Sequence, residues 1–283
     1  MKKHNLKRIF TMSGEYSLRN YTIKDLRELK GHKKLSQILT ILPEEAEAAE
    51  SAGVDLINTR FDFLNNVTSN NIRSSAPHTF MSFVIPLLTV PTKEDSLRHS
   101  FKAMELGADS IIYQGSLENI ETLSNAGIPV QGHVGLVPKK SIWTGGLKAY
   151  GKTINEVRKI FQDIKDLENA GAWAVECEVI PSKIMDVISK RTSLVTISLG
   201  SGVGGDVQLL FAEDILGDSE GPFPRHSKQY CDIYNEKQKI QKLRKSAFKD
   251  YINDIQIGNF PSDKYEVKIS DNLFDEIISN IDL

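Results

Sequence analysis

Short apolar runs alternate with amphipathic segments along most of the chain. Each run is about five to seven residues long, contains β-branched residues and is bounded by glycine or polar residues, which is typical of a buried strand. Eight strands are predicted in this way, at Gln37–Leu42, Val54–Thr59, Thr79–Ile85, Ser110–Gln114, Val130–Val134, Trp173–Val179, Leu194–Leu199 and Val207–Phe211.

The segments between these strands have the pattern of helices. Apolar residues of 153–170 fall on one face, and Thr153 with Glu156 has the spacing of a capping box. Thr92 and Asp95 form an acidic variant of that cap at the start of another helix. Glycine then stops the helix before the next strand. This helix–glycine–strand junction occurs four times, in SAGVDLINT, ELGADSIIYQ, NAGIPVQGH and NAGAWAVECE.

Eight strands with helices between most of them predict an α/β fold, a single (β/α)8 TIM barrel with N- and C-terminal helical extensions. We expect one domain over residues 1–283, with the barrel core at about 36–217 and a C-terminal helical extension at about 226–283. Within that extension, apolar residues alternate with charged ones over 236–257, which indicates a surface or subunit-contact helix.

Composition narrows the class of partner. Of 283 residues, 40% are hydrophobic and 25% charged, so the chain can bury a core, and its net charge of −2 gives no general attraction for nucleic acid. No apolar run has the length of a signal peptide or a membrane span. Cys177 and Cys231 are too few for a disulfide framework. We expect a cytoplasmic protein that binds neither nucleic acid nor membrane.

Polar residues stand where two of the predicted strands end. In a barrel of this type, catalytic residues occupy such positions, which here hold His133 and Glu178. Glu176 lies two residues from Glu178, on the same face of the strand. The alternatives are a core histidine and a structural ion pair. Gly200–Asp206 is either an anion-binding loop that includes Ser201 or an ordinary glycine-rich turn.

Four motifs in order resemble those of the ketopantoate (3-methyl-2-oxobutanoate) hydroxymethyltransferase family, of the phosphoenolpyruvate/pyruvate barrel superfamily. The family patterns are roughly GHLGLTPQ, a GG…QGR segment, AGA…LECVP and GIGAG…DGQ. The order and spacing agree from about Ala46 to Phe260. The matching segments here are Gly132–Pro138, Gly145–Lys152, Ala170–Pro181 and Gly200–Gln208.

This resemblance implies one-carbon transfer in pantothenate biosynthesis. A base forms the enolate of a 2-oxo acid, which attacks the methylene of 5,10-methylenetetrahydrofolate, and Mg²⁺ holds the keto acid. An ungapped match of Ala170–Pro181 places the family's glutamate base at Glu178. The resemblance also makes His133 a substrate-binding residue, together with Gly200 and Ser201. The family forms large homo-oligomers, so a homo-oligomer is expected.

The family's metal ligands match poorly here. Its two aspartates and one glutamate correspond to Phe61, Val84 and Gln114, and Asp62 replaces the first ligand only with a shift of one residue. Mg²⁺ prefers carboxylate and other hard oxygen ligands. We therefore expect weak Mg²⁺ binding at that position. Arg60 would instead bind the substrate carboxylate, beside Asp62 and Gln114, unless it is a surface arginine.

Two further functions remain open from the sequence. One is a C–C lyase or aldolase of the same superfamily that uses Glu178 and Arg60 without folate. The other is a non-catalytic barrel that serves as a subunit or binding partner. The polar segment Asn65–Pro77 is expected to form a mobile lid loop, with Arg73 as a further candidate cation.

Overall fold

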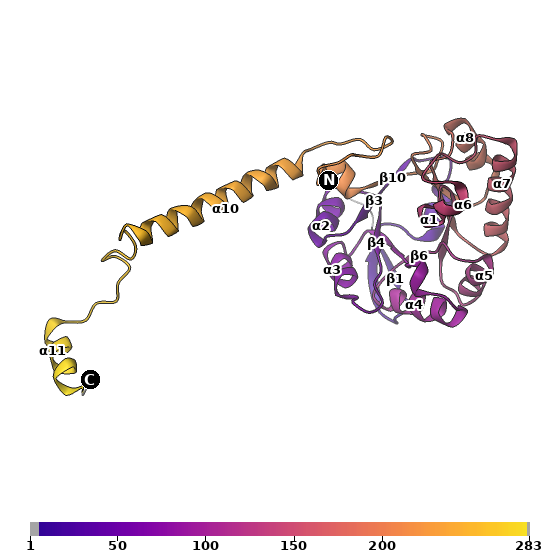
Figure 1. The fold of residues 1–283 in the computed structure, drawn as a ribbon. Coiled ribbons are helices and arrows are strands. Elements are labelled where there is room, and N and C mark those ends of the chain that lie inside the picture. The colour runs from indigo at the N-terminus through magenta and orange to yellow at the C-terminus, as the bar shows by residue number, and fades with distance from the viewer. Residues whose placement is uncertain (1–5, 282–283) are drawn as a thin grey trace. The chain divides into compact units, whose positions relative to one another are not determined.

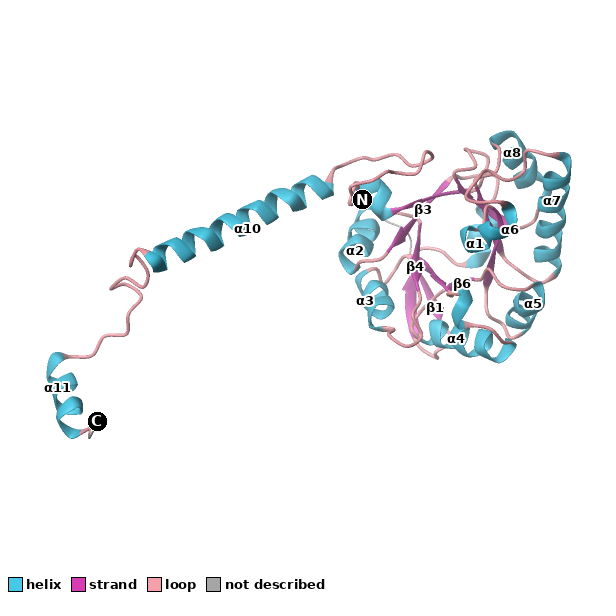
Figure 2. Cartoon of the chain, in the orientation of Figure 1, coloured by secondary structure: helices cyan, strands magenta, loops and turns pink. Residues whose placement is uncertain are grey.

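Eight parallel strands form a closed barrel in the computed structural model, which describes residues 6–281. All eight predicted strands are present, and the prediction of a (β/α)8 barrel is confirmed. Figure 1 and Figure 2 show the strands in a ring with helices around its outside. In ring order the strands are β10 (Val207–Phe211), β3 (Leu35–Thr40), β4 (Leu56–Arg60), β5 (Phe80–Val84), β6 (Ser110–Ile112), β7 (Val130–Gly135), β8 (Ala174–Glu178) and β9 (Val195–Leu199).

Helices follow most strands and pack on the outer face of the barrel. The predicted caps are confirmed, since Thr153 and Glu156 form a capping box and the Thr92 side chain accepts the backbone N–H of Asp95. Buried aliphatic residues of these helices and the outward-facing residues of the strands form the larger hydrophobic core. The helices are α2 (Pro43–Ala52), α3 (Val67–Ser75), α4 (Lys93–Glu105), α5 (Leu117–Asn125), α6 (Ser141–Thr144), α7 (Ile154–Asn169), α8 (Ser182–Arg191) and α9 (Ala212–Leu216), with short 3-10 turns η1 (Leu87–Thr89) and η2 (Pro138–Lys140).

Apolar side chains fill the lower part of the barrel interior, toward the N-terminal ends of the strands. Trp173 and Phe80 meet edge to face with ring centroids 5.5 Å apart. The indole N–H of Trp173 donates to Ser110 Oγ, which satisfies its one polar atom. Leu26 of α1 (Ile23–Leu29) belongs to the same cluster. This packing leaves only the C-terminal ends of the strands to form a site.

Two segments differ from expectation. The N-terminal extension contains an antiparallel hairpin of β1 (Lys7–Phe10) and β2 (Tyr16–Arg19) before α1, because Gly14 at φ +84° supplies a tight turn. The segment expected to be a lid loop contains α3, in which Ser69, Ile72 and Arg73 are buried. Its polar composition comes from the exposed face of this helix. The expectation of a mobile lid loop over this segment is therefore wrong.

The chain divides into two compact units, of which the second begins at Asp232. That unit contains α10 (Ile233–Gln256) and α11 (Asp271–Asn280), neither of which has a buried residue. The expected exposed helix over 236–257 is therefore present, and a single domain over the whole chain stays a prediction. Within residues 6–281, no helix combines the length and apolar character that crossing a membrane requires.

Candidate active site

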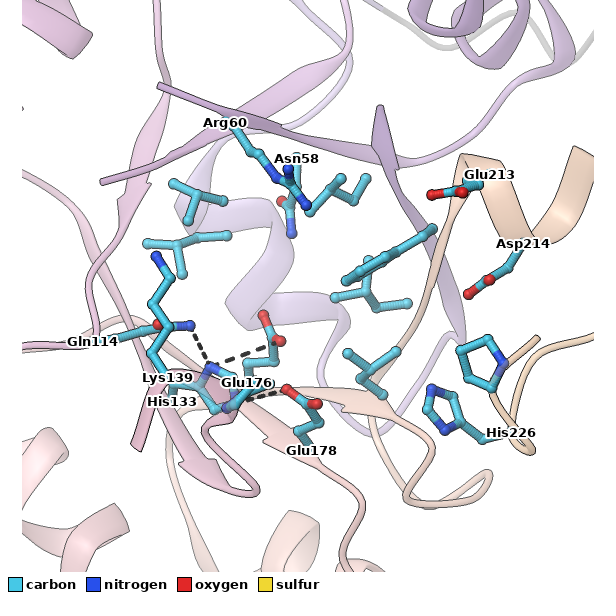
Figure 3. Close-up of a pocket in the computed structure, with 18 of the residues that line it drawn as sticks. Asn58, Arg60, Gln114, His133, Lys139, Glu176, Glu178, Glu213, Asp214 and His226 are labelled. Carbon is cyan, nitrogen blue, oxygen red and sulfur yellow. Dashed lines mark hydrogen bonds and ion pairs between the residues drawn. The ribbon is translucent and has the colours of Figure 1, made fainter. Parts of the chain in front are cut away.

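A cavity of about 700 Å³ opens at the C-terminal ends of the barrel strands. It is lined by inward-facing residues of most strands and by the segment that follows α9. Figure 3 shows Asn58 and Arg60 on one side of it, His133, Glu176 and Glu178 on the opposite side, and Glu213, Asp214 and His226 on a third. Such strand ends carry the active site in barrel enzymes.

His133 is held between two carboxylates. Its Nε2 lies 3.2 Å from Glu178 Oε2, and its Nδ1 lies 3.8 Å from Glu176 Oε1. Nδ1 also lies 2.9 Å from Gln114 Nε2, and Nε2 lies 2.9 Å from the carbonyl oxygen of Leu136. The arrangement follows from the β7–β8 register, in which His133 pairs with Glu176 and Gly135 pairs with Glu178. We call His133, Glu176 and Glu178 the carboxylate–imidazole cluster.

The pKa values of His133 and Glu176 are both raised in this cluster, for different reasons. Burial alone opposes a charged imidazole, but the carboxylates of Glu176 and Glu178 outweigh it and raise the pKa of His133. Burial also raises the pKa of Glu176, aided by the charge of Glu178 and opposed by His133. His133 and Glu176 therefore each keep a proton to higher pH than the isolated groups would. Perturbed groups of this kind in a cavity mark a functional site.

The turn after Glu178 is tightly fixed. Val179 adopts a left-handed conformation with φ 51°, which is strained for a β-branched residue. Ser201 Oγ accepts the backbone N–H of Ile180 and donates to the carbonyl oxygen of Cys177. The backbone N–H of Leu136 donates to the carbonyl oxygen of Glu178. These contacts fix the backbone on both sides of the Glu178 side chain.

The opposite wall of the cavity carries hydrogen-bond donors. Asn58 and Arg60 face inward from β4, and Gln114 and Lys139 line the cavity between them and the cluster. In the ring order, β4 is four strands from β8 in either direction, so these donors face the carboxylates across the barrel. Sequence reasoning did not find Asn58, although its position two residues before Arg60 on a strand places both on one face.

A third wall is formed by α9 and residues 219–226. Phe223 and its flanking prolines line the cavity together with Glu213, Asp214 and His226. A side chain at Gly200 would place its Cβ 2.7 Å from the His226 ring, so glycine is required for this segment to approach β9. This wall borders the mouth with both apolar and ionisable side chains.

Several expected site residues lie outside the cavity. The Asp62 carboxylate accepts the backbone N–H groups of Leu64 and Asn65. Ser201 and Gly200 shape the wall and do not line it. Phe61 is buried in the outer core, so the inward-facing position at the end of β4 is Arg60.

Arg73 is also outside the cavity. It pairs with Asp109, which directly precedes β6 at the other end of the barrel from the mouth.

The residues at three strand ends show whether the cavity could bind the Mg²⁺ that the family resemblance implies. At the ends of β4, β5 and β6 the cavity presents Arg60, Val84 and Gln114, which together offer a cation, a methyl surface and one neutral amide. Mg²⁺ is usually bound through one or two carboxylates in octahedral oxygen geometry, so these residues do not fit it. Among residues 6–281, one group of three potential metal-ligating side chains has its ligand atoms within 4.8 Å of one another, and it is the carboxylate–imidazole cluster. We derive no step through a metal.

A family model described as Ketopantoate hydroxymethyltransferase matches residues 64–263. The chain belongs to the ketopantoate hydroxymethyltransferase family. This confirms the resemblance seen in the sequence motifs. The matched range contains the carboxylate–imidazole cluster and most of the barrel strands.

Two members of the ketopantoate hydroxymethyltransferase family match this chain over most of their own length. Both are named 3-methyl-2-oxobutanoate hydroxymethyltransferase. The one from Caldivirga maquilingensis is 30% identical over 269 residues, covering 87% of this chain and 98% of the relative. The one from Deinococcus radiodurans is 33% identical over 255 residues, covering 82% and 87%. Among solved structures, Rhizobium etli pyruvate carboxylase T882A matches with a TM-score of 0.52 and 10% identity, over 68% of this chain and 24% of that chain, which shows the fold alone.

Proposed function

We infer that this protein is an enzyme that transfers a hydroxymethyl group to a 2-oxo acid, with 3-methyl-2-oxobutanoate as the first substrate to test. One observation carries this proposal: buried carboxylates on β8 face a guanidinium and an amide on β4 across a single cavity. The family membership and the names of the relatives supply the substrate class.

Glu178 is the proposed base. It lines the cavity, and its backbone is fixed by Leu136 and by the turn that Ser201 holds. His133 lies within hydrogen-bond reach of its carboxylate and orients it. A positioned carboxylate that removes the proton from C3 of the 2-oxo acid produces the nucleophilic enolate.

Arg60 is the proposed ligand for the substrate carboxylate. A guanidinium binds a carboxylate through two parallel hydrogen bonds, which fixes both position and orientation. With the carboxylate at β4, the rest of the 2-oxo acid extends toward β8, where Glu178 lies. Lys139 and Gln114 line the cavity between these two groups.

The proposed one-carbon donor is 5,10-methylenetetrahydrofolate, which supplies the methylene carbon for the new C–C bond. A cavity of about 700 Å³ has room for a second ligand beside a small keto acid. Phe223 and the adjacent prolines offer it an apolar surface, and Lys139 offers a cation at the rim.

A homo-oligomer is proposed as well. The helix α10 exposes apolar side chains along its length, among them Ile240, Leu243, Phe248 and Tyr251. A contiguous exposed apolar surface marks an interaction site, and a second copy of this chain is the partner that we propose.

Deuterium uptake at C3 of 3-methyl-2-oxobutanoate, followed by NMR, tests the function. We expect exchange with the wild type and a loss of about 10²–10⁴-fold for Glu178→Gln, which keeps the shape of the side chain but cannot accept the proton. Glu213→Gln, a carboxyl change on another wall of the same cavity, is the control and should exchange at the wild-type rate. A wild type that exchanges no 2-oxo acid would refute the proposal.

A further inference from the structure

The side-chain amide of Asn58 contains a donor without a partner. Asn58 is 1% exposed, lines the cavity and belongs to the rigid strand β4. Within the described part of the chain, its Nδ2 is among the few buried side-chain atoms that make no hydrogen bond. A buried donor of this kind destabilises the fold unless a ligand or water satisfies it, so it needs an explanation.

The other end of the amide is already fixed. Asn58 Oδ1 accepts a hydrogen bond of 2.5 Å from Gln37 Nε2 on the neighbouring strand β3. This leaves Nδ2 to face the cavity, and Figure 3 shows the Asn58 side chain pointing into it from the same strand as Arg60. The donor is therefore pre-oriented before any ligand arrives.

We propose that Asn58 is a catalytic residue that binds the C2 oxygen of the 2-oxo acid, an inference that rests on the proposed function. Arg60 holds the substrate carboxylate, and Asn58 Nδ2 donates to the oxygen on the adjacent carbon. Arg60 lies at the strand end and Asn58 one inward-facing position deeper, which is the order of a carboxylate and its neighbouring keto group when the C1–C2 bond lies along β4 and C3 points toward β8.

The proposed contact strengthens as the reaction proceeds. When the C3–H bond breaks, the proton goes to the Glu178 carboxylate, the C–H electron pair forms the C2=C3 double bond, and the π pair of the C2=O bond moves onto the oxygen. Negative charge thus develops at the atom that Asn58 holds, on the side of the cavity opposite the base. A preorganised donor aimed at developing charge lowers the barrier more than it lowers the substrate's free energy.

Calorimetric titration with two small anions tests the contact without relying on activity. Oxalate is planar and places oxygens on both carbons, as the enolate does, whereas 3-methylbutanoate has only the carboxylate. Titrations contain EDTA, so that binding reports the chain's own donors. Asn58→Leu should weaken oxalate binding about 10- to 100-fold, because a hydrogen bond to a charged group is lost. It should leave 3-methylbutanoate within about twofold of wild type.

Two further variants guard against a general loss of structure. Asn58→Asp keeps an acceptor for Gln37 but replaces the donor with a buried negative charge, so it should weaken the binding of the dianion oxalate more than that of the monoanion 3-methylbutanoate. Ser82→Ala changes a buried hydroxyl at the position paired with Asn58 in the β4–β5 ladder and should bind both anions as wild type does. Equal weakening of both anions by Asn58→Leu, or oxalate binding that appears only with added Mg²⁺, would overturn the inference.

The exchange assay separates this inference from the proposed function. Removal of one such donor typically lowers the catalytic rate about 10²–10³-fold, and we expect that loss in C3 deuterium exchange for Asn58→Leu. If wild type and Asn58→Leu exchange equally fast, the role of Asn58 is wrong while the hydroxymethyltransferase proposal stands. If wild type does not exchange, the proposed function itself fails.

Discussion

Glu176 lies directly opposite His133 in the β7–β8 ladder, with its Oε1 3.8 Å from the imidazole Nδ1. The pair is buried, and Gln131 Nε2 donates to the other oxygen of the Glu176 carboxyl group at 3.3 Å. Glu176 is therefore linked to Glu178, the proposed base, through the imidazole that lies between them.

Replacing Glu176 by Gln should lower the pKa of His133. The negative charge of Glu176 favours the imidazolium, so its removal makes that form less stable. NMR titration of the His133 ring measures the change, and Glu213→Gln is the control because Glu213 lies on another wall. A pKa of His133 that is unchanged or higher in Glu176→Gln would contradict this account.

The same substitution should change how stability depends on pH. The pKa of Glu176 is raised in the fold, so the native state binds more protons than the unfolded state and loses stability as pH rises from about 4.5 through the folded value. The raised pKa of His133 acts in the same direction at higher pH. The free energy of unfolding of Glu176→Gln, relative to that of wild type, should therefore increase from pH 5 to pH 8. Urea unfolding at both pH values measures this change. If the stability of Glu176→Gln relative to wild type instead decreased from pH 5 to pH 8, the assigned directions of the pKa shifts would be wrong.

Gly135→Ala should destabilise the protein and displace Glu178, the proposed base. Gly135 has φ +87°, and a Cβ there would lie 2.4 Å from the carbonyl oxygen of Glu178. This oxygen belongs to the backbone, so relieving the clash would require a shift of the main chain. We expect a loss of about 1–3 kcal/mol in the free energy of unfolding from the clash, with additional left-handed strain and reduced C3 exchange. Gly127→Ala is the matched control, since φ is +83° there but no atom lies within 4 Å of the added Cβ. It should cost only the strain of about 1 kcal/mol and leave exchange unchanged.

The two cysteines should differ sharply in reactivity. Cys177 is buried in β8, and burial raises the pKa of its thiol, so the nucleophilic thiolate is suppressed. Cys231 is exposed. A thiol titration with a disulfide reagent should find one reactive group in the native protein and two after denaturation. Two rapidly reacting thiols under native conditions would show that β8 opens readily.

The apolar face of α10 should support assembly. Phe248→Glu places a charge among exposed apolar residues and should lower the mass measured by light scattering coupled to size exclusion. Lys245→Glu, a charge reversal on the same helix, is the control. An unchanged mass for Phe248→Glu would remove this helix from the interface.

Repeated local signals made the barrel predictable. Glycine junctions and short apolar runs located all eight strands, because most of the strands are buried on both faces and their composition shows this directly. The polar segment that contains α3 was misjudged because Ser69 and Arg73 are buried through tertiary contacts that no local pattern reveals.

Which residues face the cavity was harder to predict. Strand periodicity places Glu178 and Glu176 on one face. The same spacing would place Asp62 beside Arg60, but β4 ends at Arg60 and the alternation stops there. That end is set by pairing with β5, a contact between segments distant in sequence. Asn58 was missed because a single asparagine in an apolar strand carries no signal of an unpaired donor. Only the structure shows that Gln37 occupies one end of its amide.

The packing of Trp173 and Phe80 beneath the polar residues closes the cavity at its inner end. A ligand at the floor, beside Asn58, can then enter and leave only through the mouth that residues 219–226 border. A bulkier second ligand nearer the mouth would cover the first. Steady-state kinetics should consequently follow a compulsory order, with the keto acid arriving before the one-carbon donor and the larger product departing before the smaller one.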